Sequence, residues 1–331
     1  MMKRSWLLLL LMCVPADGHA CGWYSNTVDD ELQNNATLFE LITGQVPHHG
    51  ATYFTEVLRR ANAKLMQDPS NPTAEMDRAY ALLQLGDFEN AERLLLATGA
   101  TNYQALSNLG VLTKKLGRYA DSTEYLAKAL AIRPEGHLGL GDYYLKRVRY
   151  SASLSDQRRP RRNFLGHPYR LRKRAADSPR LRKQLEIDSY VHGDPTLKKR
   201  ELEKLKSLIK ADRHFADAYF VLGDELVARG QLNLALLAFA RAMSLGHPRP
   251  DQIEARAELI FGHWAGTLKT VYGRGKALSH ERASDGLSAA ARELSELSQK
   301  WEAEFDAAEA VLISRGHLPS FSETRSYLLE K

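Results

Sequence analysis

Two adjacent histidines are the clearest candidates for metal ligands in this chain. His48 and His49 lie just before a predicted helix at residues 53–66. Together with Cys21 or His137 they could bind a metal ion, because imidazole and thiolate groups are common zinc ligands. However, no ligand spacing in the sequence supports such a site, and adjacent histidines cannot easily both face one ion. We therefore expect no metal centre and interpret the pair as a turn before the helix.

No other group of residues predicts catalysis. The sequence has no nucleophile–base motif, no paired-carboxylate signature and no phosphate-binding loop. The glycines at Gly262, Gly266, Gly273 and Gly275 lack the strand context that a dinucleotide-binding fold requires. We expect a protein without catalytic activity of its own and without a cofactor.

Positive charge is concentrated in one segment. Residues 146–183 contain 14 basic side chains and two acidic ones, a net charge of +12 in a chain whose total is +6. The remainder of the chain is therefore net acidic. Eleven of the 14 basic residues are arginine, which favours planar contacts to phosphate or carboxylate groups. Prolines within the segment indicate a long loop with a short helix near residues 179–185.

This basic segment supports two interpretations. It could be a solvated loop that pairs with acidic helices of the same molecule, or a surface that binds anionic lipid, a cell-wall polymer or an acidic protein. We interpret Phe164 and Tyr169 as anchors to the scaffold rather than base-stacking platforms, so nucleic acid is not an expected partner. The candidate anion-binding residues are Arg158, Arg159, Arg161, Arg162, Arg170, Arg172, Lys173 and Arg174.

The N-terminus has the features of an export signal. Lys3 and Arg4 precede an apolar stretch at residues 6–14, and small residues follow at Gly18 and Ala20. This stretch is too short to span about 30 Å of hydrocarbon, so we expect cleavage after Ala20 rather than a transmembrane anchor. Cys21 would then be the first residue and a candidate for lipidation, with free export to the periplasm or medium as the alternative.

The elements that would position these residues are helices. Two stretches carry the same pair of glycines seven residues apart, Gly110 with Gly117 and Gly223 with Gly230. The first glycine of each pair would let two helices approach closely. The second would end a helix in the left-handed conformation. Both stretches therefore predict a helical hairpin.

The two hairpins resemble the tetratricopeptide repeat, a helix–turn–helix unit of about 34 residues. In the first hairpin the family positions are matched by Leu106, Leu109, Gly110, Gly117, Tyr119, Ala129 and Pro134. In the second they are matched by Tyr219, Leu222, Gly223, Gly230, Ala235, Phe239 and Ala242. Ser122, Leu126 and Leu232 depart from the family pattern.

Two further units complete the expected stack. One precedes the first hairpin and turns at residues 86–88. The other has its first helix at residues 137–148 and its second at residues 198–210. Because Gly110 and Gly223 are 113 residues apart, which is not a multiple of the repeat length, we expect residues 149–197 to be an insertion between two helices of one hairpin.

The resemblance implies a superhelix whose groove binds other proteins. Some members of the family bind a partner's C-terminal carboxylate through basic residues on the first helices. Those basic residues are missing here, so we expect no such clamp. The candidate groove residues are Asn108, Asp142, Phe220 and Asp224, a mixed acidic and aromatic set.

The C-terminal region departs from the repeats, with helices predicted at residues 253–272 and 286–315. The second helix has a heptad seam, which predicts packing against another helix. Its members are Leu287, Ala291, Leu294, Ser298, Trp301, Phe305, Ala308 and Leu312. The seam could cap the open end of the stack or join two copies into a homodimer. We favour the cap, because Ala291 and Ala308 suit close packing within one chain.

Together these observations predict an all-α solenoid of TPR-like hairpins with a basic insertion and a C-terminal helical cap. The expected segments are a signal peptide (1–20), an N-terminal segment with one helix (21–71), repeats (72–148), the basic insertion (149–197), a repeat and a half-repeat (198–249) and C-terminal helices (250–331). The expected function is protein–protein interaction in the cell envelope. A structural homo-oligomer and an anionic-surface binding protein are the alternatives.

Overall fold

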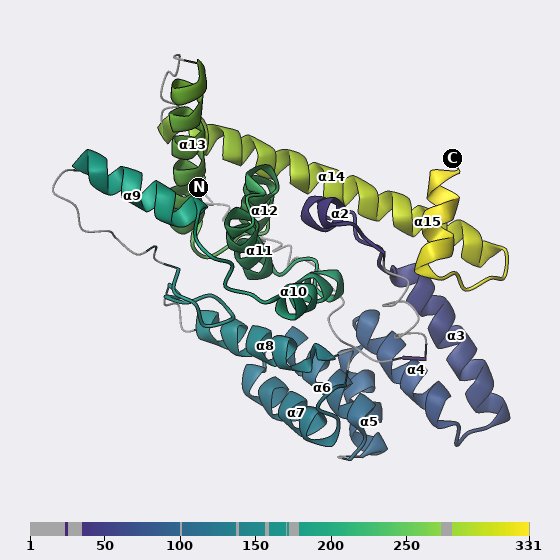
Figure 1. The fold of residues 1–331 in the computed structure, drawn as a ribbon. Helices are drawn as coiled ribbons and strands as arrows, with labels where there is room; N and C mark the ends of the chain where they lie inside the picture. Colours follow the sequence, from purple (N-terminus) through teal and green to yellow (C-terminus); the bar gives the residue numbers. More distant parts are fainter. Residues whose placement is uncertain are drawn as a thin grey trace, which may run out of the picture.

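The computed structural model describes residues 24–25, 35–99, 101–136, 139–155, 159–169, 171, 179–272 and 280–330. This part of the chain is all-α, as predicted, and its 14 helices pack as neighbouring pairs (Figure 1). They are α2 (Leu38–Thr43), α3 (Ala51–Gln67), α4 (Pro72–Gln84), α5 (Phe88–Thr98), α6 (Tyr103–Lys115), α7 (Tyr119–Ile132), α8 (Gly141–Ser155), α9 (Pro179–Val191), α10 (Lys199–Ala211), α11 (Ala216–Ala228), α12 (Leu232–Ser244), α13 (Pro250–Tyr272), α14 (His280–Ser314) and α15 (Phe321–Leu329). None of the described helices is long and apolar enough to cross a membrane.

Helices α4 to α7 and α11 with α12 form the predicted helix–turn–helix units. Gly86, Gly117 and Gly230 end the first helix of each unit with φ of +86°, +73° and +72°. Glycine adopts this left-handed conformation without the steric penalty of a Cβ atom. The next helix starts two residues later in each case, so the turn is short and the two helices are antiparallel neighbours.

The two predicted close approaches are present. A Cβ atom built on Gly110 would lie 2.6 Å from Leu126 Cγ on α7, and one built on Gly223 would overlap the Phe239 ring on α12. Each contact joins residues 16 positions apart, so the two hairpins share one register. Leu126, which departs from the family pattern, therefore fills the place that Phe239 fills in the later repeat.

The hairpin that contains the insertion differs in detail from the prediction. Its first helix, α8, begins at Gly141 and continues to Ser155, so the residues after 148 extend a helix rather than start a loop. Its second helix, α10, packs against α8 and α11. Between them, α9 replaces the predicted short helix, continues to Val191 and packs on α11 and α13.

In its described residues, the N-terminal segment contains two helices rather than the predicted one. The additional helix, α2, is only six residues long, and so short a segment has no recognisable period. Thr37 and Glu40 cap its first turn reciprocally, which is a local signal for a helix start. Ahead of it, Tyr24 is buried and stacks on Tyr80 of α4, with ring centroids 5.2 Å apart.

The long helix α14 lies across one side of the molecule from α13 to α15 (Figure 1). It begins six residues earlier than predicted and packs on α12, α13, α2 and α3 as well as α15. Most of its heptad seam is buried within the same chain, from Leu287 through Phe305 to Ala308. The polar member, Ser298, accepts a hydrogen bond from the buried Arg241 guanidinium at 2.9 Å.

Candidate functional site

Two of the four expected groove residues have no exposed surface. Asn108 and Phe220 are both fully buried. The Asn108 amide lies 3.1 Å from the Met76 sulfur on α4, and the Phe220 ring stacks on His247 at a centroid distance of 4.8 Å. These side chains belong to the core, so the surface available to a partner does not include them.

The two acidic groove residues remain accessible but already have partners. Asp142 is half-exposed, and its carboxylate lies 3.2 Å from Lys204 Nζ on α10. Asp224 accepts two hydrogen bonds from the buried Arg256 guanidinium, at 2.6 and 3.0 Å. It also accepts one from the Tyr190 hydroxyl at 2.7 Å. Because Asp142 and Asp224 contact different helices, they do not form one continuous site with the two buried residues.

Helix α11, the first helix of the last repeat, is closed on nearly every side. Its residues from Asp217 to Val227 are buried, with Asp224 only partly so. One side packs on α12 through Gly223 and Phe239. The other side is covered by the chain's own insertion, which reaches α11 at three separate points.

Asp217 holds the first of these points, the loop of residues 159–169. Its buried carboxylate accepts hydrogen bonds from the Phe164 backbone N–H (2.6 Å) and from the Tyr169 hydroxyl. His247 Nε2 lies 2.9 Å from the same carboxylate, while His247 Nδ1 accepts the Arg249 backbone N–H. Burial and the Asp217 charge raise the pKa of the Tyr169 phenol far above its ordinary value. The hydroxyl therefore stays protonated and donates.

Two further carboxylates hold the rest of the insertion. Asp224 accepts from Tyr190 of α9, and burial followed by the Asp224 charge raises the pKa of the Tyr190 phenol. Glu225 accepts the backbone N–H groups of Thr196 and Leu197 at 2.9 and 3.0 Å. All of these donors are uncharged. At these three carboxylates, the described donors of the insertion are thus backbone amides and hydroxyls.

The aromatic residues of the loop are anchors, as predicted. Phe164 and Tyr169 are 5% and 1% exposed. The Phe164 ring lies 5.1 Å from Phe215, and the Tyr169 ring lies 5.1 Å from Phe220. Gly166, at φ +87°, forms the turn between them.

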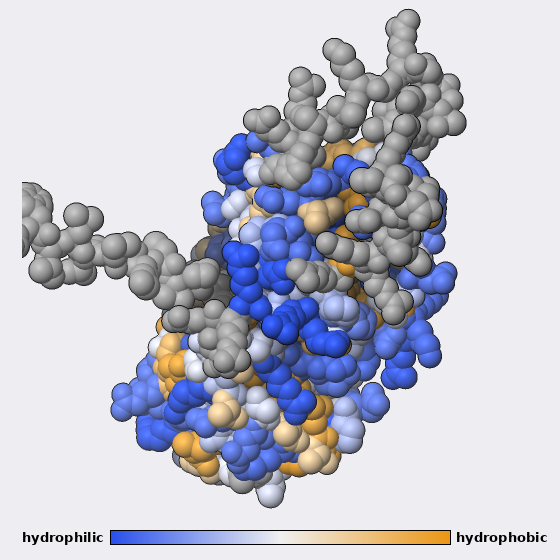
Figure 2. Space-filling view, turned by 90° about the vertical axis from the view of Figure 1, so that its left-hand side faces the viewer, coloured by the Kyte–Doolittle hydropathy of each residue, from blue (hydrophilic) through white to orange (hydrophobic). Residues whose placement is uncertain are grey.

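The arginines of the same loop point away from the core. Arg159, Arg161 and Arg162 are exposed, and neither Arg161 nor Arg162 lies in an ion pair with a described carboxylate. Figure 2 views the side of the molecule on which the loop and α9 lie, and hydrophilic side chains predominate there. The other candidate anion-binding residues (Arg158, Arg170, Arg172, Lys173 and Arg174) lie outside the described residues, as does Cys21.

The two histidines at the start of α3 have structural partners. His49 Nδ1 lies 2.5 Å from Glu309 of α14, and the Gly50 N–H donates to the same carboxylate at 2.9 Å. His48 contacts Asp306 at 3.3 Å and stacks on Phe305. Among the described residues, no group of three or more metal-ligating side chains converges. The pair lies directly before α3, as predicted, but residues 45–50 form no turn there.

A buried ion cluster links the repeats to each other. Asp212, between α10 and α11, lies 2.5 Å from Arg147 of α8 and 3.7 Å from Lys114 of α6. Burial raises the pKa of Asp212, but Arg147, Lys114 and His214 together lower it by more, so the carboxylate is ionised. Since all three side chains are buried, the cluster serves the packing of three repeats and offers no open site.

One sequence signal could have revealed the attachment of the insertion. Helix α11 is strongly apolar, yet it carries Asp217, Asp224 and Glu225. Carboxylates on a helix that is apolar on all sides must find donors from other segments. The pattern predicts that α11 is contacted by polar groups, but it does not say which segment provides them.

Comparison with known families supports the repeat assignment. Residues 103–135 match the family model described as tetratricopeptide repeat. They comprise α6, α7 and the following turn, including the Gly110–Leu126 contact and the left-handed Gly117. A comparison with curated proteins gave no match. The chain therefore carries a tetratricopeptide repeat, at residues 103–135 of an all-α stack of helical hairpins.

Proposed function

We propose that this protein is an exported tetratricopeptide-repeat scaffold that binds a protein partner in the cell envelope and has no catalytic activity of its own. The repeat at residues 103–135 carries this proposal, because stacked helical hairpins present extended surfaces suited to protein binding. Of the expected groove residues, Asp142 is the one whose carboxylate is about half exposed. We place the partner surface around it, between α8 and α10.

The proposal is tested by affinity capture from an envelope extract with charge-reversed variants. Asp142→Lys should lose the proteins that the unmodified protein enriches. Glu304→Lys on α14 is the matched control, since Glu304 is similarly exposed and lies in a surface ion pair. This control should retain the enriched proteins. Enrichment of no protein above the tag alone would contradict the scaffold function, and equal loss in both variants would contradict the surface.

Export is a separate part of the proposal. It rests on the basic, apolar and small-residue regions of the first 20 residues. Intact-mass measurement of the native protein should show a chain that begins at Cys21. A larger mass by one diacylglycerol group would assign lipidation to Cys21, whereas a mass that includes Met1 would contradict export.

A second candidate function, binding of an anionic surface, is supported by the exposed arginines. The described donors that attach the insertion to the α11 carboxylates are uncharged, so Arg159, Arg161 and Arg162 are not among them. Like charges this close together repel each other and are stabilised by anions. Sedimentation with anionic vesicles should weaken steeply with salt, because exposed charges are screened beyond about 8 Å at physiological ionic strength.

The test compares two variants with the same net charge. Replacing Arg158, Arg159, Arg161 and Arg162 by serine should abolish sedimentation and leave the melting temperature nearly unchanged. The control replaces four exposed basic residues elsewhere, namely Arg59, Lys128, Arg200 and Lys300. It should sediment like the unmodified protein, because these four residues lie outside the basic insertion. Its melting temperature should also change little, since surface ion pairs contribute about 0–1 kcal/mol each. A lower melting temperature in the first variant alone would favour pairing within the scaffold.

A further inference from the structure

The side of α11 that does not pack on α12 is covered by the chain's own loop of residues 159–169. This loop is held as a bound peptide would be. Asp217 accepts one backbone N–H and one phenol O–H from the loop. Pro160 contributes a backbone carbonyl, which accepts from the Arg249 guanidinium at 2.9 Å. These are groups that a polypeptide segment from another protein could equally supply.

Two aromatic pockets complete the contact. Phe164 lies among Phe215, Tyr143 and the neighbouring core, with ring centroids 5.1 and 6.0 Å away. Tyr169 packs edge-on against Phe220, and its hydroxyl lies 2.6 Å from that of Tyr150. Between the two anchors the chain turns at Gly166, and an antiparallel backbone bridge joins Arg162, ahead of the first anchor, to Pro168. The site therefore favours a peptide that has an aromatic residue, then a tight turn, and a tyrosine five positions after the aromatic residue.

We propose that this face of α11 is a peptide-binding site and that the 159–169 loop is its resident internal ligand. The external ligand is a partner segment with the same chemistry, an aromatic residue and a tyrosine on either side of a turn, which binds by displacing the loop. This inference rests on the proposed protein-binding function and gives it a second surface, distinct from the one around Asp142.

The buried carboxylate determines how such an exchange must proceed. Once a displacing segment covers Asp217 again, the carboxylate needs donors in place of the Phe164 N–H and the Tyr169 hydroxyl, because a buried charge short of donors is strongly unfavourable and only the His247 contact remains of those described. A displacing segment must therefore bring its own N–H and O–H groups. An anionic ligand is excluded from this site, because it would face the Asp217 charge.

The internal ligand also has a concentration advantage. A segment tethered by short linkers has an effective concentration on the order of 1 mM. A free peptide at micromolar concentration therefore binds the unmodified protein poorly, and weakening the loop should expose the intrinsic affinity of the site.

The first experiment measures the binding of a fluorescent peptide with the sequence of residues 161–169 to the full chain, by anisotropy. The variant Phe164→Ala with Tyr169→Ala should bind it about tenfold or more tightly than the unmodified protein. His167→Ala is the matched control, because only backbone atoms of His167 bond within the loop. It should bind as weakly as the unmodified protein. A peptide with alanine at both aromatic positions should not bind the double variant.

A folded double variant that fails to bind the peptide overturns the proposal. If capture of envelope proteins persists in that case, the scaffold function stands and only this site is lost. Equal binding of the two peptides would also overturn it, since the aromatic pockets would then play no part.

The second experiment uses the unmodified protein and does not depend on the folding of a variant. Amide hydrogen exchange reports local opening of a segment separately from global unfolding. The Phe164 N–H, which is bonded to Asp217, should exchange at least about a hundredfold faster than the Leu222 N–H within α11. Equal protection of the two amides would mean that the loop leaves only when the whole protein unfolds, and the loop would then be a fixed part of the fold.

Discussion

Single glycines decide how closely the helices of this protein approach each other. Gly110 and Gly223 occupy equivalent places in two repeats, and each lies against the side chain 16 positions later. Gly286 on α14 is also helical but has free space beside it, since a Cβ atom there would meet no atom within 4 Å. The same substitution should therefore have opposite effects at these positions.

Replacing Gly110 or Gly223 by alanine should lower the free energy of unfolding by about 1–3 kcal/mol, because the new methyl group overpacks the contact. Gly286→Ala should raise it by about 0.5–1 kcal/mol, because alanine has the higher helix propensity. Urea denaturation of the three variants measures both signs. A neutral result at Gly110 and Gly223 would show that the neighbouring helices can move apart without cost.

His48 gives the fold a pH dependence. Burial, followed by the nearby Arg213 charge, lowers the pKa of His48 below its ordinary value of 6.5, although Asp306 and Glu302 oppose the shift. The unfolded chain therefore binds a proton more readily than the folded one. Stability is fully present above pH 6.5 and falls as the pH drops towards the folded pKa.

The free energy of unfolding should be lower at about pH 5 than at about pH 7.5, and His48→Gln should reduce this difference. Titration of Glu302 does not contribute to this difference in the free energy of unfolding. Burial raises its pKa, but His214 and Arg213 lower it by more, so it titrates below this window. Chemical denaturation at both pH values provides the comparison, and an unchanged difference in the variant would assign the effect to other groups.

At the scale of elements, contacts with distant helices hold the segment that precedes α2. Tyr24 lies ahead of the first described helix, yet it packs on Tyr80, Tyr53 and Phe54. The Ser25 N–H donates to Asp77 of α4 at 2.7 Å. If export removes residues 1–20, the new N-terminus would therefore lie only a few residues from an anchored position on α3 and α4.

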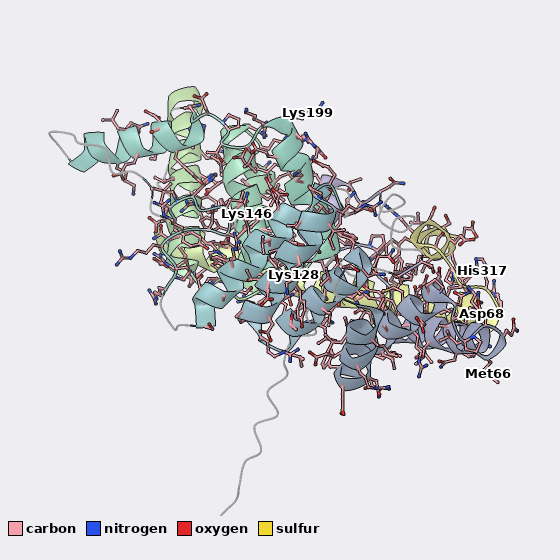
Figure 3. All side chains as sticks on the ribbon, turned by 90° about the horizontal axis from the view of Figure 1, so that it is seen from below. Met66, Asp68, Lys128, Lys146, Lys199 and His317 are labelled. Carbon is pink, nitrogen blue, oxygen red and sulfur yellow. The ribbon has the colours of Figure 1, made fainter. Side chains whose placement is uncertain are left out.

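Tyr24→Ala should lower the free energy of unfolding by about 3 kcal/mol, since it removes a buried aromatic ring from a stacked cluster. Met66 at the end of α3 provides the control, because it is 86% exposed and points outward (Figure 3). Met66→Ala should change stability by less than about 0.5 kcal/mol. Similar stability of the two variants would mean that the segment before α2 adds nothing to the fold.

At the scale of the whole molecule, α14 ties the first helices to the last repeat. Glu309 contacts the start of α3, Glu302 contacts Arg213 between α10 and α11, and Ser298 contacts Arg241 of α12. A seam used this fully within one chain leaves little apolar surface for a second copy. We therefore expect a single chain in solution, with α14 as a clamp.

Phe305 is fully buried in the seam. A substitution there distinguishes an α14 that clamps one chain from an α14 that forms a dimer interface. Phe305→Ala should lower the free energy of unfolding by about 3–5 kcal/mol. Light scattering should give the mass of one chain before and after the change. A protein that has twice that mass, and that the substitution converts to single chains, would instead support the homo-oligomer.

The sequence by itself determined the helical hairpins. Their signals are local, since the period of apolar residues and a glycine able to adopt positive φ lie within one or two turns of each other. Gly117 and Gly230 could both be assigned from such signals. The same reasoning missed α2, which is too short for a period, and started α14 six residues late.

Only the tertiary structure decided which faces of the hairpins are open. Asn108 and Phe220 occupy family positions that would face a groove, but here they are covered by other segments of the same chain. Nothing local to α11 indicates that a loop some 50 residues earlier supplies the donors for Asp217. Burial of a face depends on which distant segment packs on it, and neither the period nor the glycine positions of a helix contain that information.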